Sequence, residues 1–241
     1  MSLSWRDPDR TCAEAHRYAD TSQHPFSEAM ARTISLRVHQ FRGEAAVVAR
    51  QADAVIALCE ERGFVHYLAM SLILRGWAIA QQGEFEKGIA EIQAGLEKEQ
   101  ATDALLFESY ALGLLADACI ANKRYGQAFD FLNQALLRLD EENSERFYAA
   151  EIYRLLGETY LRSRQDLDQA ERYFCKGLAV ACEQKAKSLE LKLRMSLYDL
   201  HELRQGSGEH RSQLAEIYGF FSEGFDTADL IMAKARLRNT A

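Results

Sequence analysis

A six-residue segment with a glycine at each end is the part of the sequence closest to a nucleotide-binding loop. Residues 83–88 read GEFEKG. In a phosphate-binding loop the second glycine is followed directly by lysine and then serine or threonine, because these side chains reach the phosphates and the bound Mg²⁺. Ile89 and Ala90 stand there instead, and Glu84 and Glu86 would repel a phosphate. We therefore interpret the segment as the turn of a helix hairpin.

The histidines and cysteines are dispersed and form no pattern typical of a catalytic or metal site. The sequence contains no Gly-x-Ser-x-Gly and no His-Glu-x-x-His run. Cys175 and Cys182 lie seven residues apart and Cys12 precedes His16 by four. Either pair could touch a metal, but neither has the second pair that a tetrahedral site needs. We predict reduced, buried cysteines, no catalytic residue, no metal and no cofactor.

The composition predicts a soluble, cytoplasmic protein that does not bind nucleic acid directly. The 241 residues include 29 lysines and arginines and 36 aspartates and glutamates, for a net charge of −7. Binding to a phosphate backbone needs a basic face, which this balance does not supply. No segment approaches the roughly 18 apolar residues of a membrane span, and the first residues lack a basic flank followed by an apolar run.

Helical periodicity covers almost the whole chain, without strand-type alternation of useful length. Proline breaks helices, and the two prolines are Pro8 and Pro25. Glycine and polar clusters separate the apolar segments, for example at Gly43, Gly83 and residues 206–208. The spacing predicts helices near residues 8–20, 26–42, 44–62, 64–82, 84–99, 104–122, 125–142, 145–163, 168–184, 187–204, 209–222 and 227–238.

Small residues recur about every 40 positions, where paired helices would cross. They are Gly76, Ala116 and Gly157 on first helices and Gly88, Ala128 and Ala170 on second helices. This pattern resembles the tetratricopeptide repeat, although that repeat usually has about 34 residues. A HEAT-type array shares the period but lacks these crossings. We predict an all-α fold, a right-handed superhelix of about five tetratricopeptide-like helix pairs with a C-terminal capping helix.

A single solenoid domain is predicted over residues 1–241. Helix 8–20 has the pattern of a second helix, so residues 1–22 are expected to end a preceding repeat and the sequence to begin inside a longer array. The helix pairs are predicted over residues 25–63, 64–100, 104–143, 145–185 and 186–224, with the capping helix over 227–239.

The fifth pair and the last helix depart from the repeat. Tyr198 and His210 stand where small crossing residues are expected, which predicts looser packing or a boundary there. Thr227 is expected at the N-cap of the last helix. Inward-facing residues of that helix are predicted to be Leu230, Ile231 and Leu237, and mostly outward-facing ones Lys234, Arg236 and Arg238. The alternative is that this apolar edge is a docking or dimerisation surface.

Several strings resemble the C-terminal region of large bacterial signalling proteins that join a class III adenylate or guanylate cyclase domain, an AAA-type ATPase module and a tetratricopeptide-like array. They lie at residues 25–27 (PFS), 74–78 (LRGWA), 82–83 (QG), 150–158 (AEIYRLLGE), 186–191 (AKSLEL) and 218–230 (YGFFSEGFDTADL). Related arrays also end ATPase-type transcription activators. The resemblance implies a regulatory or recognition role and carries no catalytic residue onto this chain.

The first helices of the pairs normally line the inner face of such a superhelix. By register from the crossing positions, this face is predicted to present Trp77, Tyr110, Asp117, Glu151, Arg154, Glu158, Arg162, Lys192, Asp199 and Glu202. Charges of both signs alternate there. The face therefore fits either a ligand groove or a solvated ladder of helical ion pairs, each worth about 0.2–0.5 kcal/mol.

These patterns favour a non-catalytic protein-interaction or regulatory domain of a larger bacterial cyclase or ATPase signalling protein. Its partner would be a protein or peptide, with domains of its own full-length chain among the candidates. The alternative is an array that senses a small-molecule effector and controls an ATPase-type transcription activator. A closed pocket beside Trp77 would favour the sensor, and an open groove with an exposed apolar strip would favour a polypeptide. The oligomeric state is left open.

Overall fold

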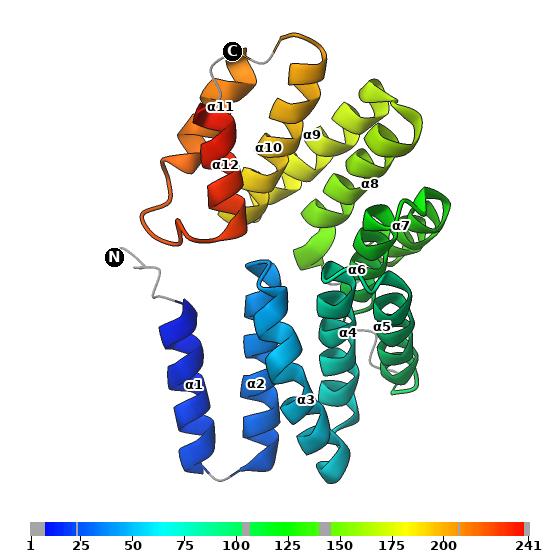
Figure 1. Ribbon diagram of the computed structural model, residues 1–241, viewed down its shortest axis with the longest axis vertical. Coiled ribbons are helices and arrows are strands. Elements are labelled where there is room, and N and C mark those ends of the chain that lie inside the picture. Colours follow the sequence, from blue (N-terminus) through cyan, green and yellow to red (C-terminus); the bar gives the residue numbers. More distant parts are fainter. Residues whose placement is uncertain (1–7, 23, 103–106, 140–145, 207, 239–241) are drawn as a thin grey trace. The chain divides into compact units, whose positions relative to one another are not determined.

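The computed structural model describes residues 8–22, 24–102, 107–139, 146–206 and 208–238, and these are all helix or connecting turn. The first five helices are α1 (Pro8–Ser22), α2 (Pro25–Phe41), α3 (Ala45–Arg62), α4 (Val65–Gln81) and α5 (Phe85–Gln100) (Figure 1). The others are α6 (Glu108–Ala121), α7 (Tyr125–Leu139), α8 (Ala149–Arg164), α9 (Leu167–Glu183), α10 (Lys187–Leu203), α11 (Gly208–Tyr218) and α12 (Ala228–Arg238). A short 3₁₀ turn, η1 (Arg146–Tyr148), leads into α8. No helix in the described residues is long and apolar enough to span a membrane.

The chain forms two compact units, Met1–Leu105 and Leu106–Ala241, called here the N-terminal and C-terminal units. Their boundary falls two residues inside the start of the helix pair predicted over 104–143. Helices α1 to α5 belong to the first unit and α6 to α12 to the second. One continuous domain over residues 1–241 stays a prediction.

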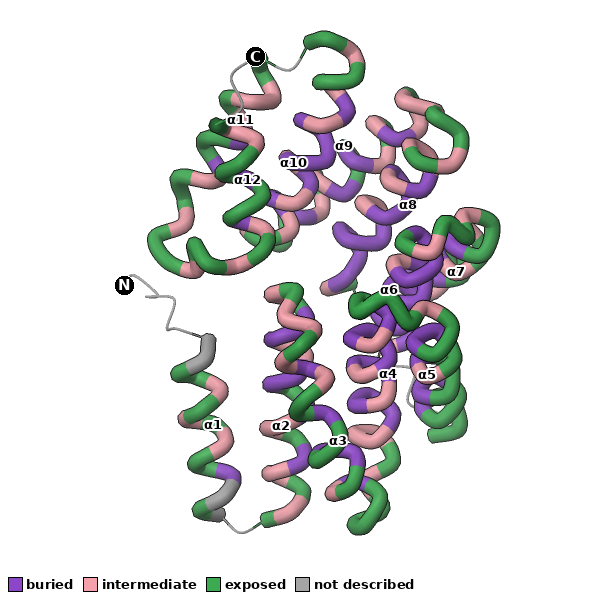
Figure 2. Tube along the Cα trace, in the orientation of Figure 1, coloured by how far each residue is buried: buried purple, intermediate pink, exposed green. Residues whose placement is uncertain are grey.

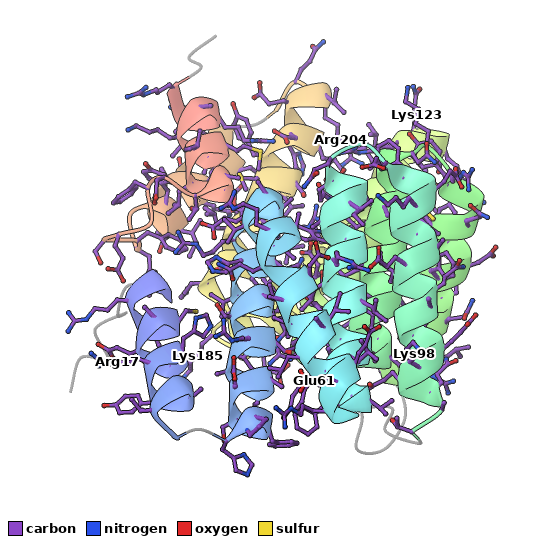
Figure 3. The ribbon with its side chains drawn as sticks, turned by 60° about the horizontal axis from the view of Figure 1, so that its bottom comes forward. Arg17, Glu61, Lys98, Lys123, Lys185 and Arg204 are labelled. Atoms are coloured by element: carbon purple, nitrogen blue, oxygen red, sulfur yellow. The ribbon has the colours of Figure 1, made fainter. Side chains whose placement is uncertain are left out.

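Tight turns with left-handed backbone join consecutive helices into antiparallel hairpins. In the N-terminal unit glycines take this conformation, with φ of 74° at Gly43, 71° at Gly63 and 93° at Gly83. Glycine has no side chain to clash there. In the C-terminal unit longer side chains hold the equivalent turns, including Lys123 (φ 59°) and Lys185 (φ 55°), which Figure 3 labels. These turns lie where the polar and glycine clusters predicted helix ends.

The predicted crossing of α4 and α5 is confirmed. A Cβ atom added to Gly76 would lie 2.7 Å from the carbonyl oxygen of Gly88, and one added to Gly88 would lie 2.6 Å from the carbonyl oxygen of Gly76. Carbon and oxygen atoms do not approach that closely, so a larger residue at either position would push the two backbones apart.

The crossing of α8 and α9 in the C-terminal unit follows the same rule. A Cβ atom on Gly157 would overlap the ring of Phe174 and lie 3.0 Å from the carbonyl oxygen of Ala170. Ala116 and Ala128, predicted to cross in the α6–α7 pair, are both fully buried. Spacing of small residues therefore identified the contact points of two hairpins, and the crossing at Ala116 and Ala128 stays a prediction.

The first helices of the pairs are neighbours within each unit. In the C-terminal unit α6 packs on α8, α8 on α10, and α10 on α12, and in the N-terminal unit α2 packs on α4. Among the described residues, the second helices α7, α9 and α11 do not contact one another closely. Since helices on the inside of a curved array lie closer together, the first helices form the inner face.

The fifth pair, α10 and α11, was predicted to pack more loosely because Tyr198 and His210 stand at its expected crossing. Helix α11 contacts α10 less extensively than α9 contacts α8. It ends at Tyr218 instead of the predicted residue 222. At the junction the rings of His201 and His210 stack with centroids 3.8 Å apart.

Helix α12 caps the array, but two of its residues point differently from the prediction. Leu230 and Ala233 are buried in a cluster with residues of α10 and α11. Ile231, predicted inward, is 53% exposed, and Arg236, predicted mostly outward, bonds to Asp199 of α10. Thr227 precedes the helix as predicted, but its hydroxyl donates to the carbonyl oxygen of Gly224 instead of accepting from the helix.

All five cysteines are free thiols, and three of them are not buried, which corrects that part of the prediction. Cys59 and Cys119 are buried as predicted, whereas Cys175 and Cys182 are exposed and Cys12 is half-buried. Both exposed cysteines lie on α9, a second helix whose outer side is not covered by another helix of the described residues.

Candidate functional site

Four charged residues of α8 lie along the inner face of the C-terminal unit. Their three- and four-residue spacing places them on one side of the helix. Arg154 donates from Nε to Glu151 Oε2 at 2.9 Å and from Nη2 to Glu151 Oε1 at 2.8 Å. One turn on, Arg162 Nε donates to Glu158 Oε2 at 2.9 Å. Arg154 Nη1 also lies 3.7 Å from Glu158 Oε1, so one ladder runs the length of α8.

Helix α10 extends this ladder to both neighbouring first helices. Lys192 Nζ lies 3.8 Å from Glu151 Oε1 on α8 and 3.8 Å from Asp229 Oδ2 on α12. The Ser196 hydroxyl donates to Glu158 Oε1 at 3.1 Å. The polar residues therefore connect three successive first helices across the inner face.

A second link joins α10 to α12. Arg236 donates from Nε to Asp199 Oδ1 at 2.7 Å and from Nη2 to Asp199 Oδ2 at 2.5 Å. This two-point geometry fixes the guanidinium in the plane of the carboxylate. We call the connected set the inner-face network: Asp117, Glu151, Arg154, Glu158, Arg162, Lys192, Ser196, Asp199, Asp229 and Arg236.

The centre of the network is buried and strongly polarised. Burial alone would raise the pKa of Glu151, but the charges of Arg154 and Lys192 and the hydrogen bonds from Arg154 lower it to about 2. Burial would lower the pKa of Arg154, yet the carboxylates of Glu151, Glu158 and Asp117 raise it. Both groups are therefore held charged inside the protein.

Two further carboxyl groups lie at the edges of this centre. Burial raises the pKa of Asp117 on α6, and the nearby Arg154 only partly offsets this effect. Burial likewise raises the pKa of Asp229, against the opposing charge of Lys192. The network thus holds five carboxyl groups and four cationic side chains. Burial disfavours the charged form of two of these carboxyl groups, those of Asp117 and Asp229.

The aromatic residues predicted on the inner face are buried. Tyr110 is fully buried on α6, and its ring meets that of Tyr148 edge to face with centroids 4.9 Å apart. Gly113 leaves room for this contact, since a Cβ atom there would lie 2.6 Å from Tyr148 Cε1. Trp77 lies on α4 in the N-terminal unit and is 4% exposed. Both rings are packed in the core and are not presented to solvent, which corrects that part of the prediction.

Exposure separates a closed part of the network from an open part. Glu151 is 5% exposed. By contrast, the side chains of Arg162 and Asp199 are 54% and 44% exposed, and Glu202, one turn beyond Asp199, is also exposed. The open part lies toward the C-terminal ends of α8 and α10.

The sequence prediction missed Asp229, Arg236 and Ser196. The first two lie on the capping helix, which was not treated as a first helix. Arg236 follows Asp199 by 37 residues, and the same offset carries Lys192 to Asp229. The predicted period of about 40 residues would have missed both by about three positions, so the repeat register alone does not identify them.

The network consists of ion pairs and hydrogen bonds between side chains on the same or adjacent first helices. The described residues contain no group of three or more histidine, cysteine, aspartate or glutamate side chains placed to hold a metal ion. In the N-terminal unit the GEFEKG segment is a hairpin turn, in which Lys87 Nζ lies 3.4 Å from Glu84 Oε2 and Gly88 packs on Gly76. Its backbone N–H groups at Gly83, Glu84 and Gly88 donate to backbone carbonyl oxygens of the same hairpin.

The comparisons with known proteins agree with this architecture. A tetratricopeptide repeat family model matches residues 107–183, which include helices α6 to α9. The fold is an all-α, tetratricopeptide-like helical repeat array. Tetratricopeptide repeats are protein-interaction modules. The comparison with curated proteins gave no match to this chain.

Proposed function

We propose that this chain is a non-catalytic protein-interaction domain that binds a polypeptide along the inner face of its C-terminal unit. In this proposal it regulates a larger bacterial signalling protein with a cyclase or ATPase module, as the sequence resemblance implies. The observation that carries the proposal is the open part of the inner-face network, where Arg162 and Glu202 are exposed and Asp199 is half-exposed on two adjacent first helices.

The physical basis is preorganisation. Glu158 accepts from Arg162 and from Ser196, so the exposed guanidinium is already held in place before any partner arrives. A partner then loses less affinity to the ordering of long side chains. Charges of both signs next to each other also reject partners with the wrong charge pattern, which favours specificity.

The binding surface is tested with peptides selected from a displayed library against the purified chain. We expect Arg162→Ala to weaken the selected peptides at least about tenfold in calorimetric titrations, as for a central interface arginine. Arg172→Ala is the matched control, because Arg172 is an exposed arginine on the second helix α9. If both variants bound the peptides as tightly as the original chain, the partner would not use this face.

We also infer that the chain does not bind or hydrolyse nucleoside triphosphates by itself. The hairpin geometry of residues 83–88 supports this inference. Calorimetric titration with Mg-ATP should therefore give no stoichiometric isotherm. A micromolar, one-to-one isotherm would contradict the non-catalytic assignment and leave the peptide experiment unaffected.

A further inference from the structure

An open apolar groove lies between α1 and α2 in the N-terminal unit. Its volume is about 420 Å³, and its lining residues are Thr11, Cys12, Ala15, Tyr18 and Ala19 of α1 and Ser27, Met30, Ala31, Ile34, Ser35 and Val38 of α2. Met30 and Ile34 are 39% and 43% exposed. Figure 2 shows α1 mostly exposed along its length.

The equivalent positions one repeat later are covered. Met70 and Leu74 of α4 follow Met30 and Ile34 by 40 residues and are almost fully buried. Helix α4 is covered there because α2 and α3 both pack against it, and the Thr33 and Ser71 hydroxyls bond at 3.3 Å between α2 and α4. Of the described helices, α2 alone packs closely against α1. The α1–α2 groove therefore corresponds to the site on α3 and α4 that the first helix α2 occupies one repeat later.

Ser35 is a second sign that this face is incomplete. It lines the groove and is 2% exposed, yet its hydroxyl has no hydrogen-bond partner in the described part of the chain. Buried hydroxyl groups normally have one.

Helix α12 carries the complementary surface. Its buried side, with Leu230 and Ala233, packs on α10 and α11 as a first helix does. On another side it exposes four apolar residues with the three- and four-residue spacing of a helical stripe. This α12 stripe consists of Ala228, Ile231, Met232 and Ala235, with Ile231 and Met232 53% and 43% exposed.

The register of the repeats shows what such a stripe normally meets. Arg236 of α12 pairs with Asp199 of α10, which lies 37 residues earlier. With the same offset, Ala235 has the position on α12 that Tyr198, the predicted crossing residue, has on α10. In α8 the crossing residue Gly157 packs on the second helix of its own pair, at Ala170 and Phe174. The α12 stripe is thus the side of a first helix that receives a second helix.

We propose that the α12 stripe of one copy of this chain binds the α1–α2 groove of a second copy, head to tail. Helix α12 is a first helix whose second-helix side is not covered by another helix of the described residues, and the same holds for the first-helix side of the second helix α1. Together they would form one helix hairpin across two molecules. Small residues on both sides, Ala228 and Ala235 against Ala15 and Ala19, allow the backbones to approach closely. This surface is independent of the inner-face network.

Such a contact is heterologous, because the two partners use different surfaces. It leaves one free groove and one free stripe on every dimer, so association continues to longer chains or closes into a ring. The average mass in solution should therefore rise with concentration beyond that of a dimer.

Two variants that each block one surface provide the test. Ile34→Glu places a charge in the groove, and Ile231→Glu places one in the stripe. Both positions are on the surface, so folding should be retained, and circular dichroism checks this. Leu137→Glu is the matched control, because Leu137 is 68% exposed on α7 and belongs to neither surface. Ala15→Glu and Met232→Glu form a second pair if a first variant fails to fold.

Sedimentation velocity of the separate and mixed variants gives the decisive comparison. The original chain and Leu137→Glu should oligomerise, and each blocking variant alone should be monomeric, with self-association weakened at least about tenfold. An equimolar mixture of the two blocking variants should form a one-to-one heterodimer and nothing larger, because one intact groove and one intact stripe remain. A monomeric original chain up to about millimolar concentration, or a mixture without heterodimer, would overturn the proposal.

Discussion

Arg154 and Glu151 form a two-point ion pair one turn apart on α8, with N–O distances of 2.9 and 2.8 Å. At a solvent-exposed site such a pair contributes only about 0.2–0.5 kcal/mol. Here Glu151 is buried and also faces Lys192, so removing its charge would leave two cations without their main counter-charge inside the protein. The Glu151 carboxylate therefore joins Arg154 of α8 to Lys192 of α10.

Replacing the carboxylate by an amide should destabilise the C-terminal unit. We expect Glu151→Gln to lower the free energy of unfolding by about 3 kcal/mol, because an unpaired buried charge is costly. Urea denaturation at neutral pH measures the difference. Glu97→Gln, at an exposed position of α5, is the control and should change stability by less than about 0.5 kcal/mol. Equal losses for both variants would contradict the burial argument.

The same carboxylate should make stability depend on acid. Its folded-state pKa of about 2 lies below the ordinary 4.5, so it contributes stability that is present above pH 4.5 and lost as the pH falls toward 2. The original chain should therefore lose more stability over this interval than Glu151→Gln does. Parallel pH profiles for the two proteins would show that Glu151 is not held ionised.

The helix crossings offer a test in which one substitution has opposite effects at two sites. Gly157→Ala should destabilise by about 1–3 kcal/mol, since the new methyl group would overlap the Phe174 ring. Gly126→Ala should stabilise by up to about 1 kcal/mol, because Gly126 is exposed in α7 with open space around it and alanine favours helix. Thermal unfolding of both variants decides the assignment. A stabilised Gly157→Ala would mean that α8 and α9 do not cross there.

The sequence was sufficient to predict these crossings because they depend on one local property. Helices approach closely only where both carry small residues, and such residues at a fixed period leave few alternative registers. Gly76 and Gly157 were located in this way. The same register located the charges of α8, whose spacing alone places them on one helix side.

Properties that depend on neighbouring elements could not be predicted in this way. Hydrophobicity alone does not determine which side of a terminal helix is covered. Ile231 was therefore predicted to face inward, but it is exposed and Ala233 is buried. Arg236 was placed outward because its partner lies 37 residues away. Likewise, whether an aromatic residue such as Tyr110 faces the groove or the core depends on the residues packed around it, here Tyr148.

The capping role of α12 is tested by two adjacent positions. Leu230→Ala should destabilise by about 2–5 kcal/mol, because Leu230 is 4% exposed within the cluster of α10, α11 and α12. Ile231→Ala should change stability by less than about 0.5 kcal/mol in dilute solution, since its side chain is half-exposed. Urea denaturation at low protein concentration separates this effect from self-association. Equal effects of the two changes would contradict the observed orientation of α12.

The stacked histidines at the α10–α11 junction couple three helices. The rings of His201 and His210 lie 3.8 Å apart and 16° from parallel. His201 Nε2 is within hydrogen-bond distance, 3.0 Å, of Glu171 Oε1 on α9, and Arg204 Nη1 donates to Glu171 Oε2 at 2.5 Å. His210 Nδ1 is buried without a hydrogen-bond partner in the described residues. A charge on the His210 ring is therefore poorly accommodated.

This geometry predicts that the α10–α11 junction weakens under mildly acidic conditions. Burial and the nearby His201 lower the pKa of His210 below 6.5, with Glu209 and Glu171 opposing the effect and Arg194 adding to it. Because the unfolded chain then takes up this proton more readily, stability falls as the pH decreases through 6.5 toward the folded-state pKa. His210→Phe keeps an aromatic ring in the stack and removes the titrating group, so its melting temperature should fall less between pH 7 and about 5. His24→Gln, at an exposed position before α2, should leave the profile of the original chain unchanged. A His210→Phe profile that matches the original chain would show that the stack does not sense protons.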